Sequence, residues 1–268
     1  MYKIFKRVIA TLRVIITLKN WVKVIYNQLF KHYSDRFLLR NGIEIRFPVK
    51  QECNLLIIYE IFINKDYTKF YDVEKDDIVV DIGANVGVFT LYAVSKNCKQ
   101  VYSFEPFPSN VKAIENNINI NHVENVTLET KAIADKEGVT KLYVVENNCG
   151  GHLIFNRNIK KNLTDYIEVD MITFPDIIKK YNLSKIDFLK IDCEGSEGYI
   201  FKTLTKDHYK IIRKIAIEFH DNVSILNHQQ IISLLEDNGF ATILKWNGTS
   251  KFGYIYAINN NTNSNYNL

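Results

Sequence analysis

The sequence lacks the patterns that mark metal-stabilised, disulfide-rich and membrane-spanning proteins. Its four cysteines form no Cys-x-x-Cys pair and have no histidine-rich motif beside them, so we predict neither a zinc site nor a disulfide framework. Four reduced thiols are typical of a cytoplasmic protein, and this is the location that we expect. The uncharged runs in the basic N-terminal stretch, among them residues 14–18, are too short for a membrane span or an apolar signal-peptide core.

Acidic residues are missing from the first 34 positions, which carry seven basic residues. The whole chain of 268 residues has a formal charge of +4, so the part after residue 34 is net acidic and does not favour a nucleic-acid partner. An apolar fraction of 47% and a charged fraction of 24% are ordinary for a globular protein. The length suits one large domain, or one domain with an extension.

The basic N-terminal stretch is also amphipathic. Apolar residues recur near helical spacing from Ile4 to Leu29, which predicts a basic amphipathic helix. Two interpretations stay open. The helix packs on its own domain, as most amphipathic helices do, or it lies on the inner, anionic face of a membrane as a peripheral contact. The sequence does not indicate an oligomeric state.

Apolar strands and amphipathic helices alternate through the rest of the chain. Strands are predicted at residues 78–81, 100–105, 126–130, 186–191 and 215–219, and helices at residues 88–96, 108–120, 173–181 and 229–238. This alternation predicts an α/β fold with a doubly wound, mostly parallel sheet. Two strands within residues 242–258 predict a final antiparallel hairpin.

The ends of the chain differ from this alternating region. Residues 38–47 alternate around Asn-Gly and predict a short strand or hairpin, and residues 55–67 predict a helix. We therefore expect a helical extension over residues 1–37, a domain over residues 38–260, and a disordered polar tail over residues 261–268.

The stretch VVDIGANVGVFTLY, residues 79–92, places a glycine loop between a predicted strand and a predicted helix. Asp81 stands at the carboxyl end of the strand, where an open α/β sheet binds its ligand. Gly83 allows a tight turn, and Gly87 lets the helix begin close to the strand with free N–H groups facing the ligand. Glu105 ends the next strand, where a carboxylate accepts both hydroxyls of a ribose. Together these residues predict a nucleoside site.

The chain contains neither Gly-x-Gly nor Gly-Lys-Ser/Thr, so the loop does not match the known cradles for phosphate groups. This absence disfavours a nicotinamide dehydrogenase. Asp81 would repel a pyrophosphate but suits a cationic ligand. S-adenosylmethionine carries an amino group, a sulfonium and a ribose, and we predict it as the cofactor.

Five segments occur in order along the chain: DIGANVGVFTLYA, SFEPFPSNVKAIENNININ, KAIADKEG, DFLKIDCEGSEGYIF and IAIEFH. In these motifs the chain resembles the FkbM family of S-adenosylmethionine-dependent methyltransferases, roughly from residue 38 to residue 258. The resemblance implies a class I methyltransferase fold, whose seven-stranded sheet ends in a hairpin with one antiparallel strand. It also implies methyl transfer, typically to a hydroxyl on a sugar, glycolipid or polyketide. The residues that the family motif would bring to the cofactor are Asp81, Gly83, Ala84, Asn85 and Gly87 in the loop, Glu105 and Pro106 at the ribose, and Ala132 near the adenine.

The catalytic candidates follow two further strands. Asp192 and Glu194 belong to the segment KIDCEGSE, and Glu218 and His220 to the segment EFH. A neutral alcohol is a weak nucleophile, so a base must take its proton while the protein holds oxygen, carbon and sulfur in line. Asp192 is the first candidate for the base or the acceptor-positioning group, Glu194 is the second, and His220 is a base candidate near neutral pH. Alternatively, the acids cap helices or pair with Lys190, and His220 is merely hydrogen-bonded.

Three features around these candidates stay open. Their carboxylates and imidazole suit Mg²⁺ or Mn²⁺, but the sequence spacing is not diagnostic, and we leave a metal as an open hypothesis. Glu60 and Tyr67 match a family segment ahead of the glycine loop, where Tyr67 either faces the donor methyl or belongs to the core. The polar loop at residues 146–158 is expected to shape an acceptor pocket.

Three functions compete for this sequence. The leading one is O-methylation of a hydroxyl on a sugar, glycolipid or other small-molecule acceptor. A nucleic-acid methyltransferase is disfavoured, because the chain has neither the Asn/Asp-Pro-Pro turn of adenine-N6 enzymes nor the Pro-Cys nucleophile of cytosine-C5 enzymes. A non-catalytic, membrane-associated binding module is disfavoured by the intact acids of both sites. The acceptor itself cannot be named, since a fold does not determine a substrate.

Overall fold

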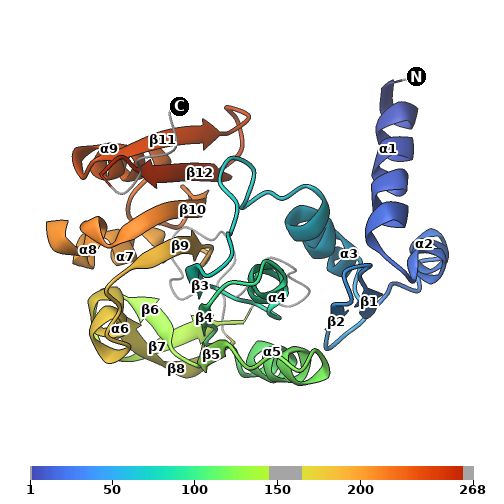
Figure 1. The fold of residues 1–268 in the computed structure, drawn as a ribbon, viewed down its shortest axis with the longest axis horizontal. Coiled ribbons are helices and arrows are strands. Elements are labelled where there is room, and N and C mark those ends of the chain that lie inside the picture. Colours follow the sequence, from blue (N-terminus) through green and yellow to red (C-terminus); the bar gives the residue numbers. More distant parts are fainter. Residues whose placement is uncertain (1, 145–164, 262–268) are drawn as a thin grey trace.

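A computed structural model describes residues 2–144 and 165–261 of the chain. Its centre is a seven-stranded sheet in the order β5-β4-β3-β9-β10-β12-β11 (Figure 1). The strands of this sheet are β3 (Ile78–Ile82), β4 (Gln100–Phe104), β5 (Val126–Glu129), β9 (Ile186–Ile191), β10 (Ile212–His220), β11 (Phe240–Lys245) and β12 (Phe252–Asn259). The first five run parallel, and β12 lies antiparallel between β10 and β11. The predicted sheet and its final hairpin are confirmed.

Helices cover both faces of this sheet. Val79 of β3 packs in one apolar cluster with α4 (Val88–Ser95) and the π-helix η1 (Tyr59–Ile63). Its neighbour Val80 packs in a second cluster with α6 (Phe174–Lys180), α7 (Glu197–Thr203) and α9 (His228–Asp237). Successive side chains of a strand point to opposite faces, so a strand covered on both sides must be apolar throughout. This requirement explains the continuous apolar runs in the sequence.

The sequence pattern did not reveal a second, three-stranded sheet, which has the order β6-β8-β7. Its strands are β6 (Ala132–Ala134), β7 (Gly138–Tyr143) and β8 (Tyr166–Thr173). Charged residues such as Lys141, Glu168 and Asp170 interrupt the apolar pattern of β7 and β8, because these strands are partly exposed. The remaining helices of this region are α5 (Pro108–Ile120) and α8 (Lys206–Lys210).

The N-terminal stretch forms two helices, α1 (Tyr2–Thr17) and α2 (Trp21–Leu29), where one was expected. The chain breaks between them because it pairs with the hairpin of β1 (Arg36–Leu38) and β2 (Glu44–Arg46). The N–H of Lys19 donates to the carbonyl of Leu38 at 2.7 Å, and the side-chain oxygen of Asn20 accepts from the N–H of Leu38 at 3.0 Å. A continuous helix would use these backbone groups internally, so tertiary pairing replaces one helix by two.

One side of the N-terminal helices belongs to the core. Val14, Leu18 and Val24 are buried in the cluster that contains Val79 of the central sheet. The other side leaves large apolar side chains exposed, and α1 projects away from the sheet (Figure 1). Packing on the domain is thus confirmed for one face of the extension. Within the described residues, no helix is both long and apolar enough to cross a membrane.

The segment before the glycine loop contains a shorter helix than predicted and a disulfide that was not predicted. α3 (Cys53–Ile58) continues into η1, and the helical structure ends at Ile63. Cys53 is disulfide-bonded, whereas Cys98 and Cys193 are free. The prediction of four reduced thiols is therefore wrong for Cys53, because spacing rules detect cysteines that are close in sequence and not a pair joined by the fold. The expected acceptor loop at 146–158 and tail residues 262–268 lie outside the described residues.

Gly83 marks the point where the ends of β3 and β9 meet. Its φ is +74°, and a Cβ added there would lie 1.7 Å from the carbonyl oxygen of Asp192. The N–H of Asp192 donates to the carbonyl of Ile82 at 3.1 Å, which holds the two strand ends together. The packing of the two strand ends therefore requires this glycine, whatever binds beside it.

We expect Gly83→Ala to lower the free energy of unfolding by about 3 kcal/mol, because alanine there is both conformationally strained and overpacked against Asp192. Gly248→Ala is the matched control, since Gly248 has a φ of +80° and no atom within 4 Å of an added Cβ. That variant should lose about 1 kcal/mol. Urea unfolding measures both losses. Equal losses of unfolding free energy in the two variants would show that the close approach of Asp192 is not the reason why residue 83 must be glycine.

Candidate functional site

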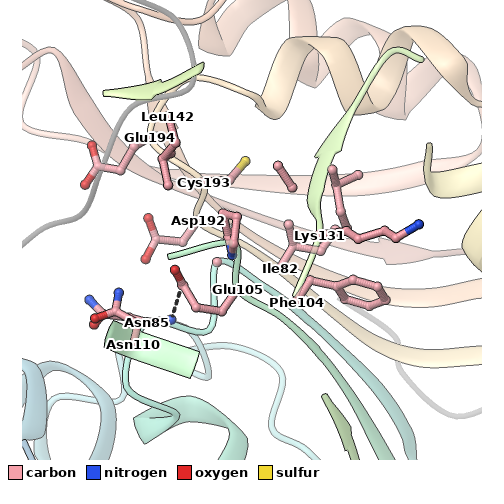
Figure 2. Close-up of a pocket in the computed structure, with 14 residues that line it drawn as sticks. Ile82, Asn85, Phe104, Glu105, Asn110, Lys131, Leu142, Asp192, Cys193 and Glu194 are labelled. Carbon is pink, nitrogen blue, oxygen red and sulfur yellow. Dashed lines mark hydrogen bonds between the residues drawn. The ribbon is translucent and has the colours of Figure 1, made fainter. Parts of the chain in front are cut away.

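Two pockets adjoin at the carboxyl ends of the parallel strands. We name them the Glu105 pocket and the Glu218 pocket after one acid that lines each of them. The Glu105 pocket lies between the glycine loop and β6, and Figure 2 shows its lining. The Glu218 pocket has a cavity volume of about 350 Å³. Both pockets are lined by Gly83, Asn85, Asp192 and Glu194, so a ligand in one would reach the edge of the other.

Glu105 presents both carboxylate oxygens at the end of β4. One oxygen accepts the N–H of Asn85 at 2.8 Å, the contact drawn in Figure 2, and the other accepts the N–H of Phe107 at 2.9 Å. Burial raises the pKa of Glu105 to about 7, although these hydrogen bonds oppose the rise. The side chain of Asn110 also hydrogen-bonds to this carboxylate, which has about four acceptor sites. The carboxylate is therefore fixed in orientation and keeps accepting capacity for a ligand hydroxyl.

Lys190 joins the glycine loop to the strand ends. Its buried ammonium lies 3.2 Å from Asp81 and 3.6 Å from Asp192, and it donates to the carbonyl of Gly83 at 2.7 Å. Burial would lower the pKa of Lys190, but the carboxylates of Asp81 and Asp192 outweigh it and raise the pKa. Asp81 is fully buried and also accepts from the hydroxyl of Thr90 at 2.7 Å. Asp81 thus holds Lys190 beside the glycine loop and lines neither of the two pockets.

Tyr67 connects two carboxylates in the Glu218 pocket. Its hydroxyl lies 2.7 Å from Asp192 Oδ2 and 2.7 Å from Glu218 Oε2. A phenol has one proton, so the two contacts together require a second proton on one of the carboxyls. Burial and repulsion by Asp192 raise the pKa of Glu218 to about 8, which makes Glu218 the protonated partner at neutral pH. Burial also raises the pKa of Tyr67 well above its ordinary value, so the phenol keeps its proton.

His220 stands between two glutamates. Its Nδ1 lies 2.9 Å from Oε1 of the fully buried Glu197, and its Nε2 lies 3.5 Å from Oε2 of Glu194. Burial would lower the pKa of His220, but the carboxylates around it, first of all Glu197, raise it well above its ordinary value. Burial also raises the pKa of Glu194. Glu194 has a φ of +51°, a conformation that non-glycine residues adopt more often at functional sites.

The structure brings most of the predicted site residues to the two pockets. Gly83, Asn85, Glu105, Pro106 and Ala132 line the Glu105 pocket, while Ala84, Tyr67, Glu218 and His220 line the Glu218 pocket, and Asp192 and Glu194 line both. Asp81 and Gly87 line neither pocket. Asp81 is buried beside Lys190, and Gly87 caps the N-terminus of α4 and lies against Ile114. What each residue binds stays a prediction.

Two functional side chains were not among the predicted site residues. From the sequence, Lys190 is expected only as a possible partner of the acids. A lysine inside the apolar strand FLKI nevertheless indicates a buried ion pair, because a buried lysine needs a carboxylate. Glu197 gave no such signal, because it lies at the start of a helix, where an acid is ordinary. Its contact with His220 appears when β9 and β10 pair.

The strand order and the antiparallel β12 define a class I methyltransferase fold. The family model of the Methyltransferase FkbM domain matches residues 81–242, which is more than half of the chain. The protein therefore belongs to the FkbM methyltransferase family, and the family expected from the motifs is confirmed. Membership implies S-adenosylmethionine as the cofactor.

Curated relatives are similar over most of their length. Methyltransferase 1 of Beauveria bassiana is 26% identical over 205 residues, which are 69% of this chain and 80% of the relative. The 31-O-demethyl-FK506 methyltransferase FkbM of Streptomyces tacrolimicus is 24% identical over 233 residues, 76% of this chain and 88% of the relative. The crystal structure of methyltransferase FkbM from Methylobacillus flagellatus KT is 17% identical with a TM-score of 0.48, covering 72% of this chain and 46% of that protein, so this chain spans less than half of its length.

The described residues fit S-adenosylmethionine. The fixed carboxylate of Glu105 suits the two hydroxyls of its ribose, and Ala132 lines the same pocket. Asp192 and Glu194, where the pockets meet, complement the positively charged ammonium and sulfonium groups of the cofactor. The N–H groups of Gly83 and Ala84 both donate to the carbonyl of Phe104 at 3.0 Å, so these two groups of the turn do not form a phosphate cradle. The site therefore agrees with the cofactor that the family implies.

We expect the affinity for S-adenosylhomocysteine to fall about ten-fold between pH 8 and pH 6. With a pKa of about 7, Glu105 is roughly nine tenths ionised at pH 8 and roughly one tenth ionised at pH 6, and the ionised form accepts the ribose hydroxyls. Calorimetric titration across this range measures the change. Glu105→Gln should bind more weakly at pH 8 and lose the slope. An unchanged slope in the variant would assign the titration to another group.

Proposed function

We propose that this protein transfers a methyl group from S-adenosylmethionine to a hydroxyl oxygen of a sugar, glycolipid or other small-molecule acceptor. The observation that carries the proposal is the hydrogen-bonded chain of Asp192, Tyr67 and Glu218 in the Glu218 pocket. When bound in the Glu105 pocket, the cofactor supplies a methyl group activated by a positively charged sulfur. Asp192 lines both pockets, so an acceptor held beside it stands at their junction.

Glu218 is the proposed general base. The acceptor oxygen forms its bond to the methyl carbon, the carbon–sulfur bond breaks with its electron pair left on sulfur, and the hydroxyl proton passes to ionised Glu218. Tyr67 fixes the carboxyl of Glu218 through the 2.7 Å hydrogen bond. The sequence predicts two alternative roles for Asp192, the base or the group that positions the acceptor. In the proposed reaction Asp192 positions the acceptor. Its Oδ2 already receives the hydroxyl of Tyr67 and faces Lys190.

The lining of the Glu218 pocket supports an acceptor that combines a hydroxyl with an apolar part. Apart from the acids, Lys190 and His220, much of the wall is aliphatic or aromatic, formed by Leu56, Ile57, Ile61, Val88, Phe89 and Phe252. Four acidic side chains in the same pocket, Glu60, Asp192, Glu194 and Glu218, would repel a nucleic-acid backbone. These features favour a neutral glycoside or glycolipid over a nucleic acid.

A screen of hydroxylated glycosides and lipids with labelled S-adenosylmethionine tests the reaction. The expected product is a methyl ether, which resists mild alkali, whereas a methyl ester would release its label. Folded protein that binds S-adenosylhomocysteine but labels no acceptor would favour the non-catalytic binding module.

With an acceptor in hand, we expect turnover to rise roughly ten-fold between pH 7 and pH 9. The pKa of about 8 leaves roughly one tenth of Glu218 ionised at pH 7, and the base must be ionised to take the proton. Glu218→Gln should reduce turnover by about 10²–10⁴-fold and remove this rise. Unchanged affinity for S-adenosylhomocysteine serves as the control for folding. Turnover near that of the unaltered protein in Glu218→Gln would exclude Glu218 as the base.

The N-terminal helices support an acceptor at a membrane. We propose that α1 and α2 rest on the inner, anionic lipid face as a peripheral contact. Among the side chains from residue 9 onward, whose exposure is described, five large apolar ones of α1 and α2 are more than half exposed, namely Leu12, Ile16, Val22, Tyr26 and Leu29. Residues 1–34 contain basic residues and no acid, which complements anionic headgroups. The buried face of the same helices anchors them to the domain.

We expect the double variant Ile16→Gln, Leu29→Gln to bind phosphatidylserine-containing vesicles at least about ten-fold more weakly, since each side chain buries apolar area in the lipid. Both residues are exposed, at 67% and 74%, so the fold should tolerate the change. Val139→Gln is the matched control, because Val139 is 59% exposed on β7. Vesicle co-sedimentation measures the binding. Equal binding by the double variant and the control would overturn the membrane proposal.

A further inference from the structure

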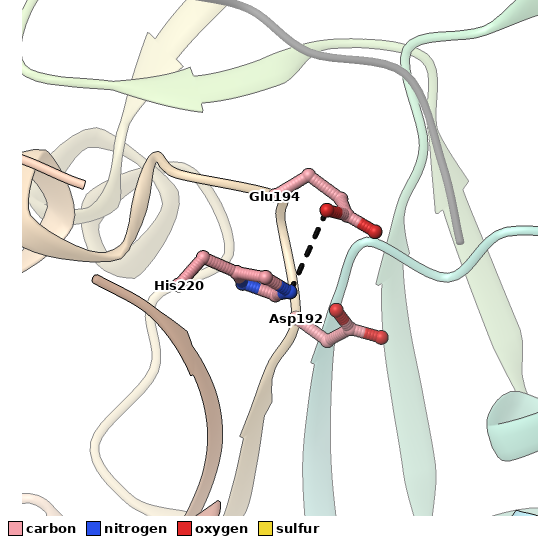
Figure 3. Close-up of side chains that lie close together, drawn as sticks. All are labelled: Asp192, Glu194 and His220. Atoms are coloured by element: carbon pink, nitrogen blue, oxygen red, sulfur yellow. Dashed lines mark ion pairs between the residues drawn. The ribbon is translucent and has the colours of Figure 1, made fainter. Parts of the chain in front are cut away.

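Three side chains with metal-ligating atoms converge where the two pockets meet. One such atom from each of Asp192, Glu194 and His220 lies within 4.8 Å of the other two (Figure 3). Donors bonded to one ion at about 2.1 Å are about 3 to 4 Å apart, so small side-chain rotations would bring all three onto a common ion. We propose that these residues hold a divalent first-row cation such as Mn²⁺ beside the acceptor, an inference whose catalytic meaning rests on the proposed function.

The orientation of His220 supports this site. Its Nδ1 is engaged at 2.9 Å by Glu197, which is fully buried, and its Nε2 therefore faces Asp192 and Glu194, as Figure 3 shows. Histidines that bind metal ions generally have their second nitrogen held by a carboxylate or a carbonyl in this way. The distance of 3.5 Å between Nε2 and Glu194 exceeds a normal charge-assisted hydrogen bond. The pair is thus separated by a distance that suits a shared ion.

The turn after β9 presents the two carboxylates on one side. Glu194 adopts a φ of +51°, and the N–H of Gly195 donates to Oε1 of Glu197 at 3.1 Å, which ties the turn to the partner of His220. Tyr67 and Lys190 both approach Oδ2 of Asp192. Oδ1 is therefore the oxygen through which Asp192 would bind an ion.

The charge of this region also favours a cation. Glu197 is fully buried, and its second carboxylate oxygen has no hydrogen-bond partner within the described residues. With Asp192 and Glu194 it makes three acids beside Lys190 and His220, so a divalent ion would offset the excess. Two carboxylates and one imidazole suit manganese, iron or zinc better than calcium, which prefers oxygen ligands.

A cation in this position would serve the proposed reaction. It would bind the acceptor hydroxyl, lower the pKa of that hydroxyl and orient its oxygen toward the methyl group. The proton would still pass to Glu218, which lines the same pocket. The ion would therefore add positioning and acidity to the base that the structure already provides.

Binding of Mn²⁺ alone tests the site without any acceptor. Free Mn²⁺ gives an electron paramagnetic resonance signal that is lost on binding, and we expect one binding site per chain in the full-length protein. Glu194→Gln and His220→Gln should each weaken binding at least about ten-fold, and Glu197→Gln, which acts through His220, about ten-fold or more. Glu60→Gln is the matched control, since Glu60 lines the Glu218 pocket but does not belong to the group of three.

Calorimetry with S-adenosylhomocysteine on the same samples separates the outcomes. Urea unfolding shows which variants are folded without depending on a cofactor contact, so the loss of Mn²⁺ binding in a folded variant is assigned to the site. An equal loss in Glu60→Gln, or retained binding in both Glu194→Gln and His220→Gln, would overturn the inference. Protein that binds S-adenosylhomocysteine but no Mn²⁺ would overturn it and leave the proposed function standing. Protein that binds Mn²⁺ at this site but methylates no acceptor would overturn the function and leave the site.

Discussion

The buried ammonium of Lys190 is the interaction on which the rest of the site depends. It pairs with Asp81 below the glycine loop, lies near Asp192 at the end of β9, and donates to the carbonyl of Gly83. One side chain thus joins two strands and the loop between the pockets. Removing one partner of a buried ion pair leaves an uncompensated charge, which costs several kcal/mol. These buried contacts of Lys190 therefore help to set the relative position of the two pockets.

Several acidic side chains lie close together beside this ion pair. Tyr67 lies between Asp192 and Glu218, and the region responds by holding a proton on Glu218 at neutral pH. Glu197 holds the imidazole of His220 through a contact of 2.9 Å with its Nδ1. Such crowding raises the free energy of the folded state, and it is tolerated where a cationic ligand, a metal ion or a transferable proton uses it. The proposed base and the proposed cation site are two consequences of this one arrangement.

The comparisons and the geometry inform different levels of the function. Membership in the FkbM family assigns methyl transfer and implies the cofactor. The proposed acceptor site is the Glu218 pocket, whose lining combines apolar side chains with acids. The two N-terminal helices add a further element, because one face packs on the domain and the other exposes apolar side chains next to basic ones. A shared fold determines neither the acceptor nor the role of the N-terminal helices.

The sequence by itself determined the alternating strands and helices, the glycine loop and the acids at the strand ends, because periodicity and turn residues are local properties. It also indicated the family, and most of the site residues that it predicted line the two pockets. Tertiary structure decided what those residues do to one another. Tyr67 and Glu218 are 151 positions apart, and they share a proton because the fold brings the segment after η1 to the carboxyl-terminal part of β10. The break between α1 and α2, the disulfide of Cys53 and the orientation of His220 likewise depend on distant partners, and no local pattern specifies which distant side chains will meet.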